Sequence, residues 1–235
     1  MEWVSQVSTP SPAETRLRKV TTQMFIRLPR LIALLRDIRQ RSQMATADEA
    51  TSLALDLHAL EDVEAETKLL ESALTVKTRA NPDWKFVPWS YDFRCSQEWE
   101  AAVLYWSARL IHIRLCQTLA IHCPAAEPIL RHATLRSTQL RMASNILMSW
   151  QYVGDLDKFG YGTRMKEASI IAWGGLCDME TYESMPVAAV AEWIVWRLKD
   201  VGCKLDVSAM QAYIDGLAGG PVEGIRRLQG GDTSA

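Results

Sequence analysis

The residues best suited to chemistry lie on one face of a single long stretch, residues 96–122. Tyr105, Arg109, His112 and Cys116 follow one another at intervals of three or four residues, which aligns them along one side of a helix. A phenol, a guanidinium and an imidazole in line can bind or protonate a ligand at a pocket. The alternative is a line of hydrogen-bonded polar groups on a buried helix, which is the commoner arrangement.

Metal and cofactor chemistry is not indicated by the sequence. A metal site needs three or four converging ligands, and the spacing brings together only His112 and Cys116. Dinucleotide-binding, phosphate-loop, serine-hydrolase and zinc-protease motifs are absent. One cluster of carboxylates invites comparison with the magnesium sites of helical terpene cyclases, although an acidic solvated face explains it equally well: Glu61, Asp62, Glu64 and Glu66. We therefore predict no metal, no cofactor and no catalytic residue.

Aromatic side chains provide the second set of candidate binding residues. The stretch 75–94 has no helical period, contains two prolines and carries five aromatic residues, among them Trp84 and Trp89. We expect it to be a loop that lies across the helices and caps their core; the alternative is the wall or lid of a pocket. The predicted ligand-binding set is therefore Tyr105, Arg109, His112, Trp84, Trp89 and Trp106.

The stretch that carries these residues is predicted to be the central helix of the fold. Residues 96–122 have two nearly opposite apolar faces, so the helix must be buried on most of its circumference. Ser96 is the expected N-cap, and Pro124 explains the end of the helix. The two faces consist of Trp99, Val103, Trp106, Leu110, Ile113 and Ile121, and of Leu104, Ile111, Leu115 and Leu119.

The remaining periodic segments predict further helices that surround this one. Pro29 should break or kink the first of these helices. The basic surface of that helix should pair with the acidic surface of the second helix in an antiparallel hairpin. Gly174 and Gly175 indicate a close helix crossing or a kink, and Asp206 is the expected N-cap of the last helix. Arg141 is expected to face outward. The predicted helices span residues 13–44, 47–74, 127–153, 164–180, 186–201 and 206–217.

No sustained strand alternation accompanies these helices. The sequence predicts an all-α fold, a single bundle-like domain of about seven helices. Residues 1–12 are expected to form a flexible arm, residues 13–218 the helical domain, and residues 219–235 a disordered tail.

Composition narrows the classes of function. A net charge of -2 over 235 residues argues against a broad nucleic-acid-binding surface. Five cysteines with no Cys-x-x-Cys pair do not form a disulfide framework, which favours an intracellular protein in the nucleus or cytoplasm. No window approaches the roughly 20 apolar residues of a membrane span, and the N-terminus lacks the order of a secretory signal.

Four segments together resemble the regulatory domain of fungal-specific transcription factors of the binuclear zinc-cluster type. The stretch 105–119, YWSARLIHIRLCQTL, is similar to that family's aromatic, leucine-rich helix. The stretches 25–38, 171–183 and 192–217 are similar to its leucine-proline helix, its tryptophan helix and its closing element. The resemblance covers about residues 15–218. It implies an all-α regulatory domain that senses ligands and controls activation.

Two departures from the family pattern shape the functional prediction. Trp173 is followed by Gly174 and Gly175, where the family commonly has proline and leucine, and the six-cysteine zinc cluster that reads DNA is missing. The resemblance therefore implies a regulatory body without a DNA-reading module, which acts through protein partners or a small hydrophobic ligand. Apolar surface on the terminal helices leaves a homodimer open.

Two other classes of function remain open from the sequence. One is an all-α enzyme of specialised metabolism that cyclises or isomerises a hydrophobic substrate in an aromatic-lined pocket. The other is a purely structural interaction module with an exposed apolar face.

Overall fold

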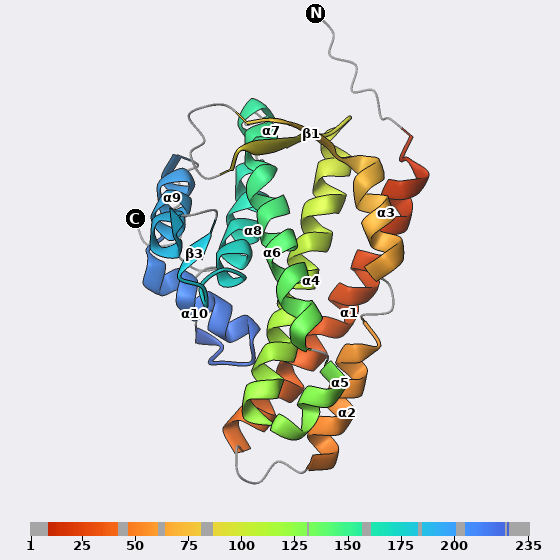
Figure 1. Ribbon diagram of the computed structural model, residues 1–235, viewed down its shortest axis with the longest axis vertical. Helices are drawn as coiled ribbons and strands as arrows, with labels where there is room; N and C mark the ends of the chain where they lie inside the picture. Colours follow the sequence, from red (N-terminus) through yellow and green to blue (C-terminus); the bar gives the residue numbers. More distant parts are fainter. Residues whose placement is uncertain are drawn as a thin grey trace, which may run out of the picture.

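The computed structural model shows helices packed around one long central helix (Figure 1). It describes residues 9–41, 47–60, 64–80, 87–130, 132–156, 161–182, 185–200, 205–223 and 225. The helices are α1 (Pro12–Arg41), α2 (Ala47–His58), α3 (Glu64–Leu74), α4 (Ser96–His122), η1 (Pro124–Ala126), α5 (Glu127–Leu130), α6 (His132–Met148), α7 (Trp150–Leu156), α8 (Tyr161–Gly174), α9 (Val187–Asp200) and α10 (Val207–Leu217). The strands are β1 (Val76–Arg79), β2 (Trp89–Asp92), β3 (Thr181–Tyr182) and β4 (Met185–Pro186). The predicted all-α class is confirmed, since the chain is 78% helical with two small sheets in its described part.

The central helix is α4, as the two-faced apolar pattern predicts. It packs against α1, α6 and α8, and nearly every residue from Glu98 to Leu119 is buried or half-buried. Two details of the prediction were wrong. Cys95 occupies the N-cap position in place of Ser96 and makes no side-chain cap, and Ile121 lies in the last, protruding turn with 75% of its surface exposed.

The first helix begins with a side-chain cap and runs on past its proline. Ser11 Oγ accepts a hydrogen bond from the Glu14 N–H at 3.1 Å, which satisfies one of the free amides at the start of α1. The helix continues across Pro29, which is exposed and does not interrupt the buried stripe on the opposite side. Where α1 ends and α2 begins, Arg41 contacts Glu49 at 3.2 Å, which is one ion pair between the predicted basic and acidic helices.

Two predicted helices are divided in the structure. The segment 47–74 contains α2 and α3, with a turn at Ala59 and Leu60 where the chain leaves α2. The segment 127–153 contains α5, α6 and α7. The Ser149 N–H is shared between the carbonyls of Asn145 and Ile146, and its Oγ donates to Ile146, which tightens the turn between α6 and α7.

The predicted aromatic loop is in part a β-hairpin. Strands β1 and β2 pair antiparallel, with Val76 opposite Asp92 and Arg79 opposite Trp89. β-Branched and aromatic residues in these strands favour this structure, but four residues are too short for a clear alternation. The hairpin lies at one end of the bundle (Figure 1), and Ser90 Oγ donates to the Met148 carbonyl at 3.1 Å. The expectation that this segment covers the core therefore agrees with its position.

The C-terminal helices have two features that the sequence predicts, a close crossing at a glycine and a capped N-terminus. A Cβ at Gly174 would lie 2.6 Å from a side-chain carbon of Ile214, so the close crossing predicted there joins α8 to α10. The predicted cap on α10 is confirmed, because Asp206 accepts from the Ala209 N–H at 2.7 Å. The predicted tail starts against α1, where Arg36 Nε donates to the Gly220 carbonyl at 2.9 Å. Most of the predicted arm and tail lies outside the described residues.

Candidate functional site

The polar line of α4 is buried and bonded within the protein. Tyr105 Oη lies 2.6 Å from Thr67 Oγ1, which connects α4 to α3. Arg109 donates to His112 Nδ1 at 2.9 Å, and His112 Nε2 lies 2.8 Å from the Leu57 carbonyl at the end of α2. Because a guanidinium only donates and a carbonyl only accepts, Nδ1 is the acceptor and Nε2 carries the proton. These side chains join α4 to α2 and α3.

The surroundings of the His112 ring favour its neutral form. Burial, and next the nearby Arg109 charge, lower the pKa of His112 to about 3. His112 is therefore uncharged near neutral pH. Neither it nor Tyr105 nor Arg109 lines any of the pockets found in the described part of the chain. Their geometry matches the hydrogen-bonded alternative, while a ligand at these residues stays a prediction.

The predicted aromatic residues do not gather at one site. Trp106 is fully buried and stacks on Tyr91 with ring centres 5.9 Å apart. Trp89 lies in β2 with 43% of its surface exposed, and the Lys77 ammonium lies 4.9 Å from the centre of its ring. Trp84 lies outside the described residues. The aromatic contacts around Trp106 fill the core under the hairpin.

A buried ionic network that the sequence did not indicate lies beside these aromatic residues. Arg141 donates to Glu71 Oε2 at 2.6 Å, so the expectation that Arg141 faces outward was wrong. Tyr91 Oη donates to Asn145 Oδ1 at 3.1 Å, and Asn145 Nδ2 lies 3.4 Å from the same Glu71 oxygen. Burial, and next the Glu71 charge, raise the pKa of Tyr91. The network joins α3, α6 and β2.

One group of described residues has the composition of a metal site but also carries matching cations. Ligand atoms of Glu14, Cys95 and Glu98 all lie within 4.8 Å of one another. Arg18 pairs with Glu14 at 2.9 Å, and Arg94 pairs with Glu98. The two guanidiniums already neutralise both carboxylates, so these residues do not need an ion for charge balance. The acidic cluster that begins at Glu61 lies largely outside the described residues.

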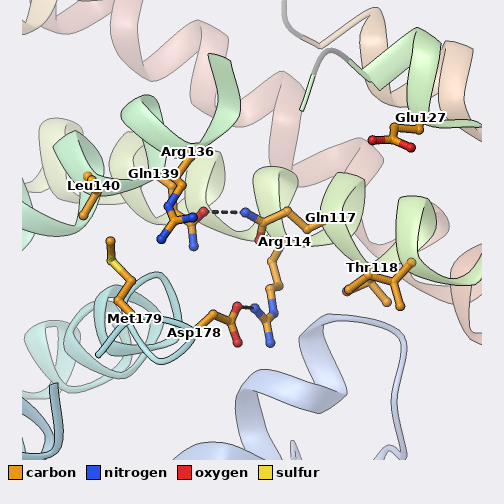
Figure 2. Close-up of a pocket in the computed structure, with 10 residues that line it drawn as sticks. Arg114, Gln117, Thr118, Glu127, Arg136, Gln139, Leu140, Asp178 and Met179 are labelled. Carbon is orange, nitrogen blue, oxygen red and sulfur yellow. Dashed lines mark hydrogen bonds and ion pairs between the residues drawn. The ribbon is translucent and has the colours of Figure 1, made fainter. Parts of the chain in front are cut away.

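A large open cleft of about 710 Å³ lies in the described part of the chain (Figure 2). Its walls are the C-terminal half of α4, the segment from α5 into α6, and the turn that follows α8. We call it the α4–α6 cleft. Its lining residues are Arg114, Gln117, Thr118, Ile121, Glu127, Arg136, Gln139, Leu140, Asp178 and Met179. None of them is in the ligand-binding set predicted from the sequence.

A chain of amides fixes one wall of the α4–α6 cleft. Gln139 Nε2 donates to the Gly175 carbonyl at 2.7 Å, which orients the Gln139 amide, since a carbonyl only accepts. Its Oε1 then accepts from Gln117 Nε2, an interaction that Figure 2 shows. Because both amide groups are oriented in this way, α4, α6 and the turn after α8 are held together.

Charged and apolar groups share the rim of the cleft. Arg114 pairs with Asp178 across it, from α4 to the turn after α8 (Figure 2). Arg136 and Glu127 are exposed on the opposite wall, and among the described residues neither has an ion-pair partner. Ile121 adds an exposed apolar side chain. No histidine or cysteine lines the cleft, so its groups are suited to recognising charged, amide and apolar parts of a ligand.

The sequence did not reveal this cleft because its walls are distant in the chain. Gln117 and Gln139 lie 22 positions apart, and Asp178 comes from a third segment. The one available signal was Gln117, a polar interruption in the apolar face of a buried helix.

Comparison with protein-family models, curated proteins and solved structures finds no match. Among the described residues, no helix combines the length and apolar character needed to cross a membrane.

Proposed function

We propose that this chain is a regulatory interaction domain that binds a segment of a partner protein in the α4–α6 cleft. The observation that carries the proposal is the composition of that cleft: it is large, open, and lined by guanidinium, carboxylate, amide and apolar groups. A polypeptide presents all of these complementary groups, whereas a small apolar molecule does not. A regulatory role is also what the resemblance to fungal transcription-factor domains implies.

The charged groups in the larger pockets favour a protein partner over a small apolar ligand. Typical small-molecule sites have volumes of about 300–1,000 Å³ and mostly apolar walls. One pocket, between α1, α4, α8 and α10, has a volume of only about 110 Å³. For comparison, an apolar cavity of about 150 Å³ binds benzene. A second pocket, of about 460 Å³, has Trp173, Met179 and Val187 in its lining, but it also contains the carboxylates of Glu180 and Glu192, which an apolar ligand would leave without a counterpart.

Each kind of group in the α4–α6 cleft has a counterpart in an extended peptide. Arg136 can pair with a carboxylate, and Glu127 with a cation, each without breaking an ion pair found among the described residues. Ile121 provides an apolar contact next to them. Exposed side chains of this type contribute modestly one by one, so we expect a weak to moderate, specific interaction.

Native mass spectrometry of the chain purified from its own host tests the choice between a protein partner and a small ligand. Anything bound is then released by denaturation and identified. We expect a polypeptide in the bound fraction and no stoichiometric small molecule. A stoichiometric apolar molecule would contradict the proposal and favour a sensor of that molecule, and turnover of that molecule would favour an enzyme.

A further inference from the structure

The outward side of α1 carries an apolar strip that the core does not use. Phe25, Ile26, Pro29 and Ala33 are all exposed, and their spacing places them next to one another on the helix surface. Ile26 has 73% of its surface exposed and Phe25 38%. The buried residues of α1, such as Met24 and Leu28, lie on the other side. The apolar strip is therefore in addition to the apolar face that α1 packs against the bundle.

A row of cations runs along the same helix beside this strip. Between Glu14 and Asp37 the sequence has six basic residues and no acidic one. Lys19, Arg27 and Arg30 are exposed, and no ion pair or hydrogen bond is found for their side chains among the described residues. We call the strip and these three cations together the α1 outer face. It is amphipathic across its width, with apolar groups on one edge and positive charges on the other.

A small pocket opens at the apolar edge of the α1 outer face. Phe25 forms one side of it, α4 its floor, and α8 and α10 its far side. Its volume of about 110 Å³ is below the about 150 Å³ of a cavity that binds benzene, so it has room for a single aliphatic side chain. The lining residues are Phe25, Trp99, Glu100, Val103, Leu104, Ser107, Arg164, Glu167, Ala168, Ile171 and Tyr213.

We propose that the α1 outer face and its pocket bind an acidic amphipathic helix of a partner protein, with one aliphatic side chain of that helix in the pocket. Charge complementarity carries this choice, since three exposed cations without an ion pair among the described residues favour a partner with carboxylates on the matching flank. Lys19 and Arg30 are 11 residues apart, which corresponds to about 16 Å of helix, or about three turns of a docked helix. Docking of an apolar helix face into such a groove is a recurrent mode of recognition.

The pocket favours a protein partner over an anionic lipid surface, which the same cations would also attract. A hollow for one side chain is matched by a protruding residue, whereas a membrane presents a broad surface. This docking site shares no lining residue with the α4–α6 cleft, so it stands or falls independently of the proposed function.

A labelled peptide tests the proposal on the full chain. The probe is a fluorescein-labelled 18-residue peptide of Leu, Ala and Glu, with Leu at intervals of three and four residues. We expect saturable binding by fluorescence anisotropy, and weaker binding by about tenfold for Arg27→Glu/Arg30→Glu and for Ile26→Asp. The matched controls Lys77→Glu/Arg79→Glu on β1 and Leu69→Asp on α3 change the same charge or polarity elsewhere on the exposed surface, and should leave binding unchanged.

Changes in the peptide test the pocket without altering the protein. Replacing the central Leu of the probe by Ala or by Trp should weaken binding, since Ala leaves the pocket empty and Trp is too large for it. Equal binding of a scrambled peptide, equal losses in the control variants, or no saturation up to about 1 mM would overturn the proposal. Binding of the chain to phosphatidylserine vesicles, in the absence of peptide binding, would overturn it in favour of a lipid surface.

Discussion

At the scale of single residues, His112 shows how a group suited to chemistry becomes part of the core. Both of its ring nitrogens are engaged, one by Arg109 and the other by the Leu57 carbonyl. A protonated ring would lose the bond from Arg109 and add a second positive charge beside that guanidinium. The fold therefore holds the imidazole neutral.

This arrangement predicts a dependence of stability on pH. The pKa of His112 is about 3 in the folded protein, against about 6.5 in the unfolded chain. The contribution of neutral His112 to the free energy of unfolding is complete above pH 6.5 and is lost as the pH falls from 6.5 towards 3. Between pH 7.5 and 5.0, we expect a loss of about 2 kcal/mol from this group in urea unfolding.

The variant His112→Gln should lack this part of the pH dependence, although it will be less stable overall. His122→Gln serves as the control, because His122 is exposed at the end of α4. An identical slope of stability with pH in His112→Gln and the unchanged protein would show that His112 is not held neutral.

Arg141 gives the second prediction at the scale of residues. Arg141→Ala leaves the buried Glu71 carboxylate without its cation, and removing one member of a buried pair typically costs about 3–5 kcal/mol. Because Arg141 is itself partly exposed, we expect a loss of about 2–3 kcal/mol in the free energy of unfolding.

Two further variants check the cause of that loss. Adding Glu71→Gln to Arg141→Ala should restore part of the stability, since the unpaired charge is removed. Arg136→Ala, an exposed arginine on the same helix, should change stability by less than about 0.5 kcal/mol. A loss in Arg136→Ala as large as that in Arg141→Ala would argue against the ion pair as the cause.

At the scale of elements, Pro29 lies inside a 30-residue helix in which it cannot donate a backbone hydrogen bond. A proline in a helix interior costs about 3 kcal/mol relative to alanine, of which some is offset because proline restricts the unfolded chain. We therefore expect Pro29→Ala to raise stability by about 1–2 kcal/mol in urea unfolding. Pro221→Ala, outside the helices, should give no such gain, and a less stable Pro29→Ala would contradict this account.

The crossing of α8 and α10 provides another prediction at this scale. In Gly174→Ala the new methyl group would lie 2.6–2.9 Å from three side-chain carbons of Ile214, so the Ile214 side chain or one of the helices must shift. Overpacking of this kind costs about 1–3 kcal/mol, which thermal or urea unfolding can measure. In a double-mutant cycle with Ile214→Ala, the penalty at position 174 should largely disappear. Simple additivity of the two changes would rule out the contact as its cause.

The elements also show how far local sequence determines the fold. The two-faced pattern of α4 and the cap at Asp206 depend on spacing within one segment, and both were predicted. The turn at Leu60 was not predicted. The carbonyls of Leu57 and Leu60 both bond side chains from α4, 49 or more positions away. Short strands such as β2 likewise depend on contacts with α6 and α7, which local patterns do not encode.

At the scale of the whole molecule, the candidate site follows from assembly of distant segments. The predicted binding residues Tyr105, Arg109 and His112 were chosen because they align on one helix, and the bundle turns them inward. The α4–α6 cleft instead combines α4 with residues from α6 and from the turn after α8. Its position becomes visible only when the helices are packed, whereas the all-α class could be predicted from periodicity alone.

The central claim is that the α4–α6 cleft receives a partner protein, and site-specific photo-crosslinking tests it most directly. A photoreactive residue replaces Ile121 at the cleft, in chains expressed in their own host. As controls it replaces Leu69, which is equally exposed, or Leu55, which is 55% exposed, elsewhere on the surface. Mass spectrometry then identifies the crosslinked peptides. We predict a defined polypeptide segment joined at position 121 and absent at 55 and 69. The same products at all three positions, or none at position 121, would contradict the claim.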